Sequence, residues 1–222
     1  MSRVMIAGAD EAGRGPLFGS LVIAGVVVND EQPLLDHNVR DSKKLSPKRR
    51  EQLAAIIKNL AISYEVLSVS AHDIDDMRRV MTLNEIEVNG FAKVLSKLKA
   101  SVYYVDSADV NEQRFGQDIQ QRISRKCEII SKHKADDIYP IVGAASIIAK
   151  TIRDQEIRCI EQELQKKLKL PLGSGYPADP VTVRFLHAWM KKYGKLPPYT
   201  RKSWKTAQNI VAKYNTKSLD EF

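Results

Sequence analysis

The sequence has few cysteines, no long apolar run and only a short apolar run near its first residue. Cys127 and Cys159 are its only cysteines among 222 residues, and neither has a further Cys or His at zinc-finger spacing. This excludes a disulfide framework and favours a reducing cytosol, so we expect a cytoplasmic protein. No uncharged stretch approaches about 18 residues, which excludes a membrane span. The apolar run at residues 4–7 is too short for a signal peptide.

Basic residues outnumber acidic ones. Lys and Arg number 35 against 27 Asp and Glu, which gives a net charge of +8 and a pI near 9.4. Such an excess favours polyanionic partners, nucleic acid among them, although many ordinary proteins share it. A chain of this length buries about 70% of its unfolded surface, so it needs neither disulfides nor metals to fold.

Apolar periodicity predicts strands interspersed with helices, and helices alone near the C-terminus. Strands are expected at 4–9, 21–28, 62–69, 102–105 and 127–130. Helices are expected after the caps Ser46 and Thr82, and over 141–168, 181–193 and 204–214. This order predicts a mixed α/β sheet domain over 1–171, a helical C-terminal extension over 172–214 and a flexible tail over 215–222.

Four acidic residues end or follow predicted strands: Asp10, Glu11, Asp106 and Asp136. Strand ends can converge at one edge of a sheet, although each acid alone could cap a helix or face water. Clustered carboxylates raise one another's pKa unless a cation neutralises them, and hard oxygen ligands favour Mg²⁺ or Mn²⁺ over zinc or copper. Two such ions could activate a water and stabilise the leaving oxygen in phosphodiester hydrolysis.

Adjacent strand residues point to opposite faces of a sheet. Asp10 and Glu11 therefore cannot both reach one metal site from a regular strand. We expect the strand to end or bend at Asp10, which Gly13 and Gly15 would permit. The alternative is that Glu11 contributes its backbone carbonyl.

The glycine-rich segment 13–19 can bring its backbone close to a ligand. Gly13 and Gly15 flank Arg14, whose guanidinium suits a phosphate. The segment is neither a Walker loop nor a dinucleotide fingerprint, and a tight turn between two strands is the alternative.

Further candidates for substrate contact are Ser42, Lys43, Ser146, Lys150 and Tyr176. The first two lie in a polar basic run, and the next two at a small-residue helix start that would suit a phosphate. Tyr176 lies on a stiff loop where a sugar or base could stack. The alternatives are a solvated loop, close helix packing and a structural loop anchor.

In this order the motifs resemble those of type 2 ribonuclease H, ribonuclease HII. Residues 10–16, DEAGRGP, resemble the N-terminal signature of that family, and its later motifs are matched at 41–45, 104–106, 133–136, 144–150 and 173–177. The resemblance covers residues 4–205 and is nearer to archaeal members. Ser20 is a departure, because the family often has proline there.

The resemblance implies a ribonuclease H-like mixed sheet flanked by helices. It implies hydrolysis of the RNA strand of RNA–DNA hybrids, and nicking at ribonucleotides embedded in DNA. It carries over Asp10, Glu11, Asp106 and Asp136 as catalytic metal ligands, for two Mg²⁺ or Mn²⁺ ions with substrate bound. Gly13, Arg14, Gly15 and Tyr176 carry over as readers of the ribonucleotide and its junction with DNA, where a single 2′-OH is the distinguishing group.

Two alternative functions remain open at this point. A non-catalytic nucleic-acid-binding module would keep Arg14, Lys43 and Lys150 without needing four acids. A DNA junction nuclease on the same fold would not need a ribose reader at 13–15. In each case we expect a monomer.

The C-terminal residues 215–222 are polar except for Leu219 and Phe222. Disorder without function is one expectation. A single helical turn would instead place both side chains on one face, which resembles the clamp-binding peptide of replication proteins. The match is partial because Thr216 replaces the usual Gln. We therefore expect a weak contact with a sliding clamp.

Overall fold

The computed structural model describes residues 5–39 and 45–219, the last three by their backbone alone. These residues form two compact units. The first takes in the chain before Gly13 together with Val22–Ser68 and Met81–Ile152, and the second takes in Gly13–Leu21, Val69–Val80 and the chain from Arg153 onward.

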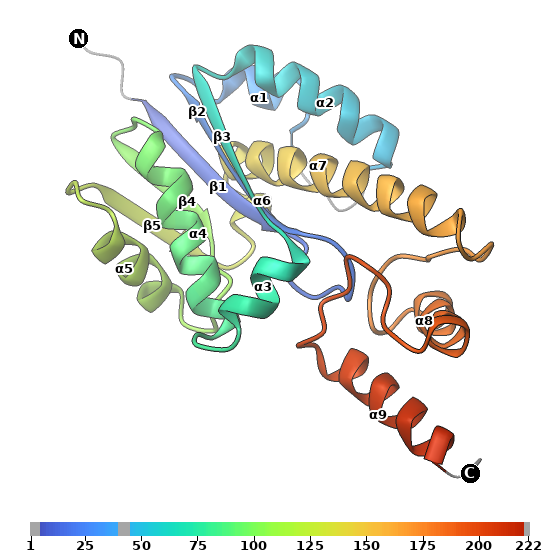
Figure 1. Ribbon diagram of the computed structural model, residues 1–222. Helices are drawn as coiled ribbons and strands as arrows, with labels where there is room; N and C mark the ends of the chain where they lie inside the picture. The colour runs from blue at the N-terminus through green and yellow to red at the C-terminus, as the bar shows by residue number, and fades with distance from the viewer. Residues whose placement is uncertain (1–4, 40–44, 220–222) are drawn as a thin grey trace. The chain divides into compact units, whose positions relative to one another are not determined.

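A five-stranded mixed sheet forms the centre of the first unit (Figure 1). Its strands are β1 (Ile6–Ala12), β2 (Leu21–Val28), β3 (Ser63–Val69), β4 (Val102–Asp106) and β5 (Glu128–Lys132), in the order β3-β2-β1-β4-β5. β1 pairs antiparallel with β2 and parallel with β4, and β4 pairs parallel with β5. The predicted mixed sheet is therefore confirmed.

The helices are α1 (Gln32–Asp36), α2 (Pro47–Leu60), α3 (Ala71–Met77), α4 (Leu83–Lys97), α5 (Glu112–Arg122), α6 (Ala135–Ile138), α7 (Pro140–Gln165), α8 (Pro180–Tyr193) and α9 (Lys205–Leu219). Ser46 caps α2, and Thr82 caps α4 through a reciprocal capping box with Glu85, as predicted. α1, α3, α5 and α6 have no counterpart among the predicted helices. In the part of the chain described, no helix is both long and apolar enough to cross a membrane.

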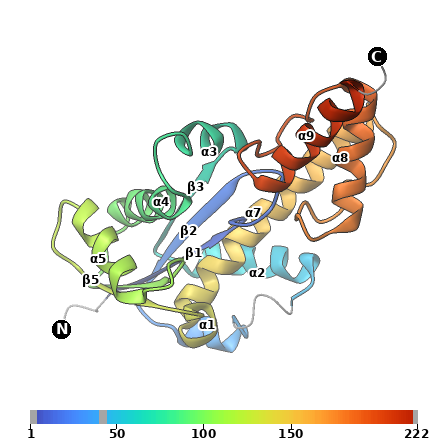
Figure 2. The same cartoon turned by 90° about the horizontal axis from the view of Figure 1, so that it is seen from below.

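Helices cover both faces of the sheet (Figures 1 and 2). On one face, side chains of β2 join a buried core with α2 and α7. On the other, α4 and α5 meet through an edge-to-face contact between Phe91 and Phe115, with ring centroids 5.3 Å apart. α7 lies directly on β1, because a Cβ at Gly8 would be 2.4 Å from the carbonyl carbon of Ile141. Only glycine permits this approach.

β1 continues in regular register past the first predicted acid. Asp10 pairs with Ala24, Glu11 with Ile23 and Ala12 with Val22, three successive pairs of the antiparallel ladder. The expectation that the strand ends or bends at Asp10 is wrong. The glycines that were expected to permit the bend come only after the strand, which ends at Ala12.

The second unit has an apolar core of its own. Leu17 and Phe18 of the glycine-rich segment pack there with Leu164, Phe185 and Trp189. α8 begins after the Asp179 cap and ends at Tyr193, where the C-cap Gly194 has a left-handed φ of 68°. α9 ends at Leu219, beyond the end predicted at residue 214.

Candidate active site

Asp10 and Asp106 lie on the same face of the sheet, the face covered by α7, and Asp136 lies beside them on α6. Asp10 is 3% exposed, and its cross-strand partner Ala24 belongs to the core shared with α7. Asp106 ends β4, and its Oδ1 accepts a hydrogen bond of 2.8 Å from the backbone N–H of Ala135 at the start of α6. Asp136, which follows Ala135 in α6, is 2% exposed. Parallel pairing of β1 with β4 thus gathers these acids at one edge of the sheet.

α7 contributes two polar residues, one helical turn apart, to the same place. The Nζ of Lys150 donates a 2.6 Å hydrogen bond to Ser146 Oγ and lies 3.7 Å from Asp136 Oδ2. Ser146 is fully buried and hydrogen-bonds the Asp10 carboxylate. The ammonium of Lys150 therefore supplies positive charge to both buried carboxylates.

The surroundings of Asp10 set the electrostatics of this cluster. Burial raises the pKa of Asp10 above its usual range, and repulsion from Asp136 adds to the rise. The charge of Lys150 and the hydrogen bonds from Ser146 and the Glu11 N–H oppose it. Because burial outweighs these contacts, further positive charge at the cluster would favour the ionised carboxylate.

The donor chemistry of the cluster fits a divalent cation. Its oxygen donors are carboxylates, the ligands that Mg²⁺ and Mn²⁺ prefer. Among residues 5–39 and 45–216, however, no three His, Cys, Asp or Glu side chains are gathered as closely as a metal ion requires. The acids therefore have the right chemistry, and binding a metal requires them to draw closer around it.

Glu11 occupies the opposite face of the sheet. Its cross-strand partner is Ile23, which lies against Gly90 of α4: a Cβ on that glycine would be 2.3 Å from Ile23 Cδ1. The Glu11 backbone N–H nevertheless donates to Asp10 Oδ1 over 2.7 Å. Strand alternation thus separates the two side chains while the Glu11 backbone stays beside Asp10.

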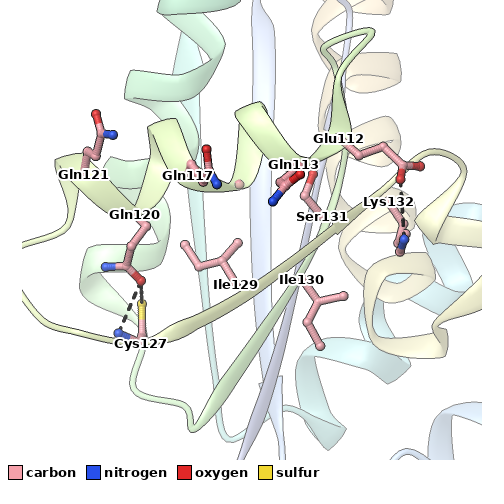
Figure 3. Close-up of a pocket in the computed structure, with 11 residues that line it drawn as sticks. Glu112, Gln113, Gln117, Gln120, Gln121, Cys127, Ile129, Ile130, Ser131 and Lys132 are labelled. Carbon is pink, nitrogen blue, oxygen red and sulfur yellow. Dashed lines mark hydrogen bonds and ion pairs between the residues drawn. The ribbon is translucent and has the colours of Figure 1, made fainter.

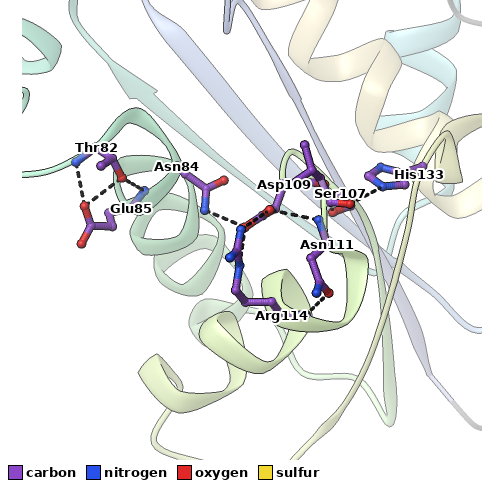
Figure 4. Close-up of polar contacts among 9 residues, drawn as sticks. Thr82, Asn84, Glu85, Ser107, Asp109, Asn111, Arg114 and His133 are labelled. Carbon is purple, nitrogen blue, oxygen red and sulfur yellow. Dashed lines mark hydrogen bonds and ion pairs between the residues drawn. The ribbon is translucent and has the colours of Figure 1, made fainter.

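A polar network fixes the loop that follows Asp106 (Figure 4). Asp109 accepts hydrogen bonds from Arg114 Nε at 3.0 Å, from Asn84 Nδ2 at 3.0 Å and from the Asn111 N–H at 3.0 Å. The Arg114 hydrogen bonds hold the pKa of Asp109 at about 2. Asp109 therefore ties the loop after β4 to both α4 and α5.

The glycine-rich segment is held within the second unit by one buried arginine. Arg201 is fully buried and donates hydrogen bonds to the carbonyls of Gly13 at 2.6 Å, Arg14 at 3.0 Å and Gly19 at 2.9 Å. Burial lowers the pKa of Arg201 to about 10. Trp204 Nε1 donates to the carbonyl of Gly15 at 3.1 Å. Four carbonyls of the segment are thus fixed from residues 201–204.

The structure brings Tyr176 together with the same segment. A Cβ at Gly15 would lie 3.7 Å from Tyr176 Cε1, and the guanidinium carbon of Arg153 lies 5.6 Å from the centre of the Tyr176 ring. The Leu17 N–H donates to the Gly175 carbonyl over 2.7 Å. Tyr176 is 43% exposed, so its ring is accessible to a ligand.

Some predicted site residues are not described by the structure, and some residues that support the site were not predicted. Ser42, Lys43 and Phe222 lie outside the described residues, and Leu219 is described only as the last residue of α9. Sequence reasoning missed the supporting residues, which are Asp109, Arg153, Arg201 and Trp204. The only hint is the basic and aromatic run RKSW at 201–204, and no pattern reveals that its arginine is buried.

A pocket of about 830 Å³ lies elsewhere in the first unit, between α5 and β5 (Figure 3). Its lining includes Gln113, Gln117, Gln120, Ile129 and Ser131. None of the predicted site residues contributes to it. The candidate chemistry therefore belongs to the edge of the sheet and not to this pocket.

Comparisons of the sequence and of the structure with known proteins all identify the same family. A model of ribonuclease HII matches residues 7–207. A ribonuclease HII from Methanothrix thermoacetophila is 46% identical over 211 residues, covering 94% of this chain and 98% of that protein. The crystal structure of ribonuclease H2 from Pyrococcus horikoshii has a TM-score of 0.88 at 40% identity, covering 95% of this chain and 99% of that one. A PCNA:RNase HII complex from Archaeoglobus fulgidus has a TM-score of 0.82 at 41% identity, covering 91% and 96%.

Asp109→Asn should lower the free energy of unfolding by about 2 kcal/mol near pH 7, because Arg114 loses a charged partner. The folded pKa of about 2 lies below the unfolded value of roughly 3.9, so this stability is present above the unfolded pKa and is lost as the pH falls through the folded pKa. Urea unfolding from about pH 7 down to about pH 3 should show the difference from wild type shrinking.

The matched control is Asp36→Asn, which alters an exposed carboxylate at the end of α1. It should change stability little at any of these pH values. A deficit in Asp109→Asn that stays constant down to low pH would contradict the role given to the charge.

Proposed function

The chain belongs to the ribonuclease HII family of metal-dependent endonucleases with ribonuclease H activity, and we propose that it both cuts hybrids and nicks DNA at single embedded ribonucleotides. The observation that supports this most directly is the gathering of Asp10 and Asp136 around Lys150. Buried carboxylates at a sheet edge suit phosphodiester hydrolysis, in which the phosphate brings further negative charge and cations must balance it.

Asp10, Asp106 and Asp136 are the side chains that we propose hold two Mg²⁺ or Mn²⁺ ions when substrate is bound. Glu11 would add its backbone carbonyl, since its side chain faces α4. Such ions lower the pKa of a bound water and stabilise the leaving oxygen. Lys150, released from Asp136, would then contact a substrate phosphate, with Ser146 orienting the Asp10 carboxylate.

The glycine-rich segment and Tyr176 are the proposed readers of the ribonucleotide. With its carbonyls fixed by Arg201 and Trp204, the backbone at Gly13, Arg14 and Gly15 is held rigid for hydrogen bonding to a 2′-OH. The exposed Tyr176 ring would stack on the sugar at the junction with DNA. Ser42 and Lys43 remain proposed phosphate contacts.

We also propose a weak sliding-clamp contact through Leu219 and Phe222. A similar ribonuclease HII forms a complex with PCNA. Two anchored apolar side chains supply roughly 1.5–3 kcal/mol each, less the cost of ordering the chain. The resulting affinity would be in the tens of micromolar, or about −6 kcal/mol.

Cys127 and Cys159 are both free thiols. This supports the proposed location in the reducing cytoplasm, where thiols persist. We propose that the protein works there as a monomer.

Asp10→Asn should abolish nearly all cleavage of a duplex with one ribonucleotide, while hybrid binding stays within a few-fold. The amide keeps the shape of the carboxylate but loses the charge that attracts cations, and phosphate contacts elsewhere supply most of the affinity. Asp137→Asn, an exposed neighbour on α6, is the control and should cleave normally.

Cleavage is measured with and without Mg²⁺, beside an all-DNA junction substrate. Near-normal turnover by Asp10→Asn in saturating Mg²⁺ would exclude Asp10 as a metal ligand. Cutting of the junction in preference to the ribonucleotide would favour the DNA junction nuclease.

Tyr176→Ala should reduce cleavage at a single embedded ribonucleotide more than cleavage of a continuous hybrid. Stacking on one sugar or base is worth roughly 1–3 kcal/mol, or about one to two decades in rate. A long hybrid offers many registers and suffers less. Tyr64→Ala is the matched control, because Tyr64 and Tyr176 are both 43% exposed. Equal losses on the two substrates would mean that Tyr176 is structural.

Removing Leu219–Phe222 should abolish binding to the cognate sliding clamp and leave cleavage of a short free duplex unchanged. The reason is that the acids belong to the first unit, and the deleted residues do not. Titrating the clamp with intact and truncated protein provides the measurement. Superimposable titrations, or a loss of nuclease activity on truncation, would refute the proposed contact.

A further inference from the structure

The excess positive charge of the chain is concentrated in the second unit. That unit contains 17 Lys and Arg against 10 Asp and Glu, a net charge of +7, whereas the first unit contains 18 against 17. No acidic residue occurs between Asp179 and Asp220. The two units therefore differ sharply in their attraction for polyanions.

Two runs of lysine in this unit lie side by side and form what we term the lysine cluster. The cluster consists of Lys166, Lys167 and Lys169 after α7, and Lys191, Lys192 and Lys195 at the end of α8. All six residues are exposed. Lys192 Nζ and Tyr193 Oη both donate to the Lys167 carbonyl, at 2.8 and 2.9 Å, and so hold the two runs together.

The lysine cluster has no countercharge of its own. Among the residues that the structure describes, none of the six lysines is in an ion pair. The nearest acids along the chain are engaged elsewhere: Glu161 accepts from the Leu172 N–H at 3.0 Å and Glu163 from Tyr199 Oη at 2.6 Å. The six ammonium groups therefore repel one another in the absence of an external anion.

Helix ends account for only part of this cluster. The negative end of the helix dipole favours Lys191 and Lys192 in the last turn of α8. Lys169 and Lys195 lie beyond the last residues of α7 and α8, where this attraction has fallen off. A binding role explains all six together.

We propose that the lysine cluster binds the phosphate backbone of duplex nucleic acid. The proposal rests on the proposed function in that it makes the substrate duplex the polyanion. Flexible lysines act as point charges, so the contact would not distinguish RNA from DNA. It would hold the enzyme on ordinary duplex, where release of counterions drives non-specific binding and sliding.

The test compares two charge-matched triple variants on an all-DNA duplex of about 30 base pairs. The first, Lys166→Gln/Lys169→Gln/Lys191→Gln, spares Lys192, whose Nζ supports the Lys167 carbonyl. The control, Lys93→Gln/Lys99→Gln/Lys126→Gln, removes exposed lysines from the first unit. Thermal unfolding confirms that both variants fold.

The cluster variant should bind the DNA about tenfold or more weakly near 0.1 M salt. A plot of the logarithm of its binding constant against the logarithm of the salt concentration should become shallower, its slope smaller in magnitude by about 2–3. The reason is that each phosphate contact contributes about −0.9 to that slope. The DNA affinity of the control should remain within about twofold of that of wild type. The control loses the same net charge, but it loses it outside the lysine cluster.

Equal losses in the two variants, or no loss in either, would overturn the proposal. Retained DNA binding with lost binding to phosphatidylserine vesicles would overturn it in favour of a lipid surface. Cleavage of an RNA–DNA hybrid by wild type in Mg²⁺ is assayed separately. Failure there would refute the proposed function, whereas the comparison of DNA affinities tests the lysine cluster alone.

Discussion

The shared ammonium of Lys150 is the interaction on which the acidic cluster depends. Asp10 and Asp136 are two nearly inaccessible carboxylates, and burial raises the pKa of Asp10, with repulsion from Asp136 adding to the rise. Lys150 reaches them only because α7 lies directly on β1 at Gly8. Because Gly8 has no side chain, α7 can approach β1 closely enough to bring the Lys150 ammonium to this edge of the sheet. A site balanced in this way suits a reaction in which cations and a phosphate arrive together.

In the second unit, a buried cationic side chain, Arg201, holds the backbone of the glycine-rich segment in place. The role proposed for the glycine-rich segment, reading a ribose, requires a backbone that is both close to its ligand and rigid, and glycine permits close approach but reduces rigidity. Arg201 restores rigidity by donating to three carbonyls, and Trp204 adds a fourth contact. A buried guanidinium with every bond to a neutral carbonyl is costly to desolvate, and burial lowers its pKa accordingly.

Much of this arrangement follows from the sequence, and the remainder depends on long-range packing. The apolar run that ends in Asp106 predicted the end of β4, and the caps at Ser46 and Thr82 predicted helix starts, whereas β1 continues two residues past Asp10. The short helices α3 and α6 have too few residues for a periodic pattern. The regular path of β1 through Glu11 is imposed by its ladder with β2, which outweighs the nearby glycines. Arg201 lies 188 residues from Gly13 in the sequence, so its role was not readable from local pattern.

We propose that Asp10 and Asp136 exchange the ammonium of Lys150 for divalent cations when substrate binds. A crystal structure with Mn²⁺ and a non-cleavable hybrid tests this exchange, because the anomalous scattering of manganese locates the ions directly. We expect Mn²⁺ to be coordinated by Asp10, Asp106 and Asp136, and Lys150 Nζ to lie farther from Asp136 Oδ2 than its present 3.7 Å. Manganese bound away from these carboxylates, or Lys150 still seated against Asp136, would contradict it.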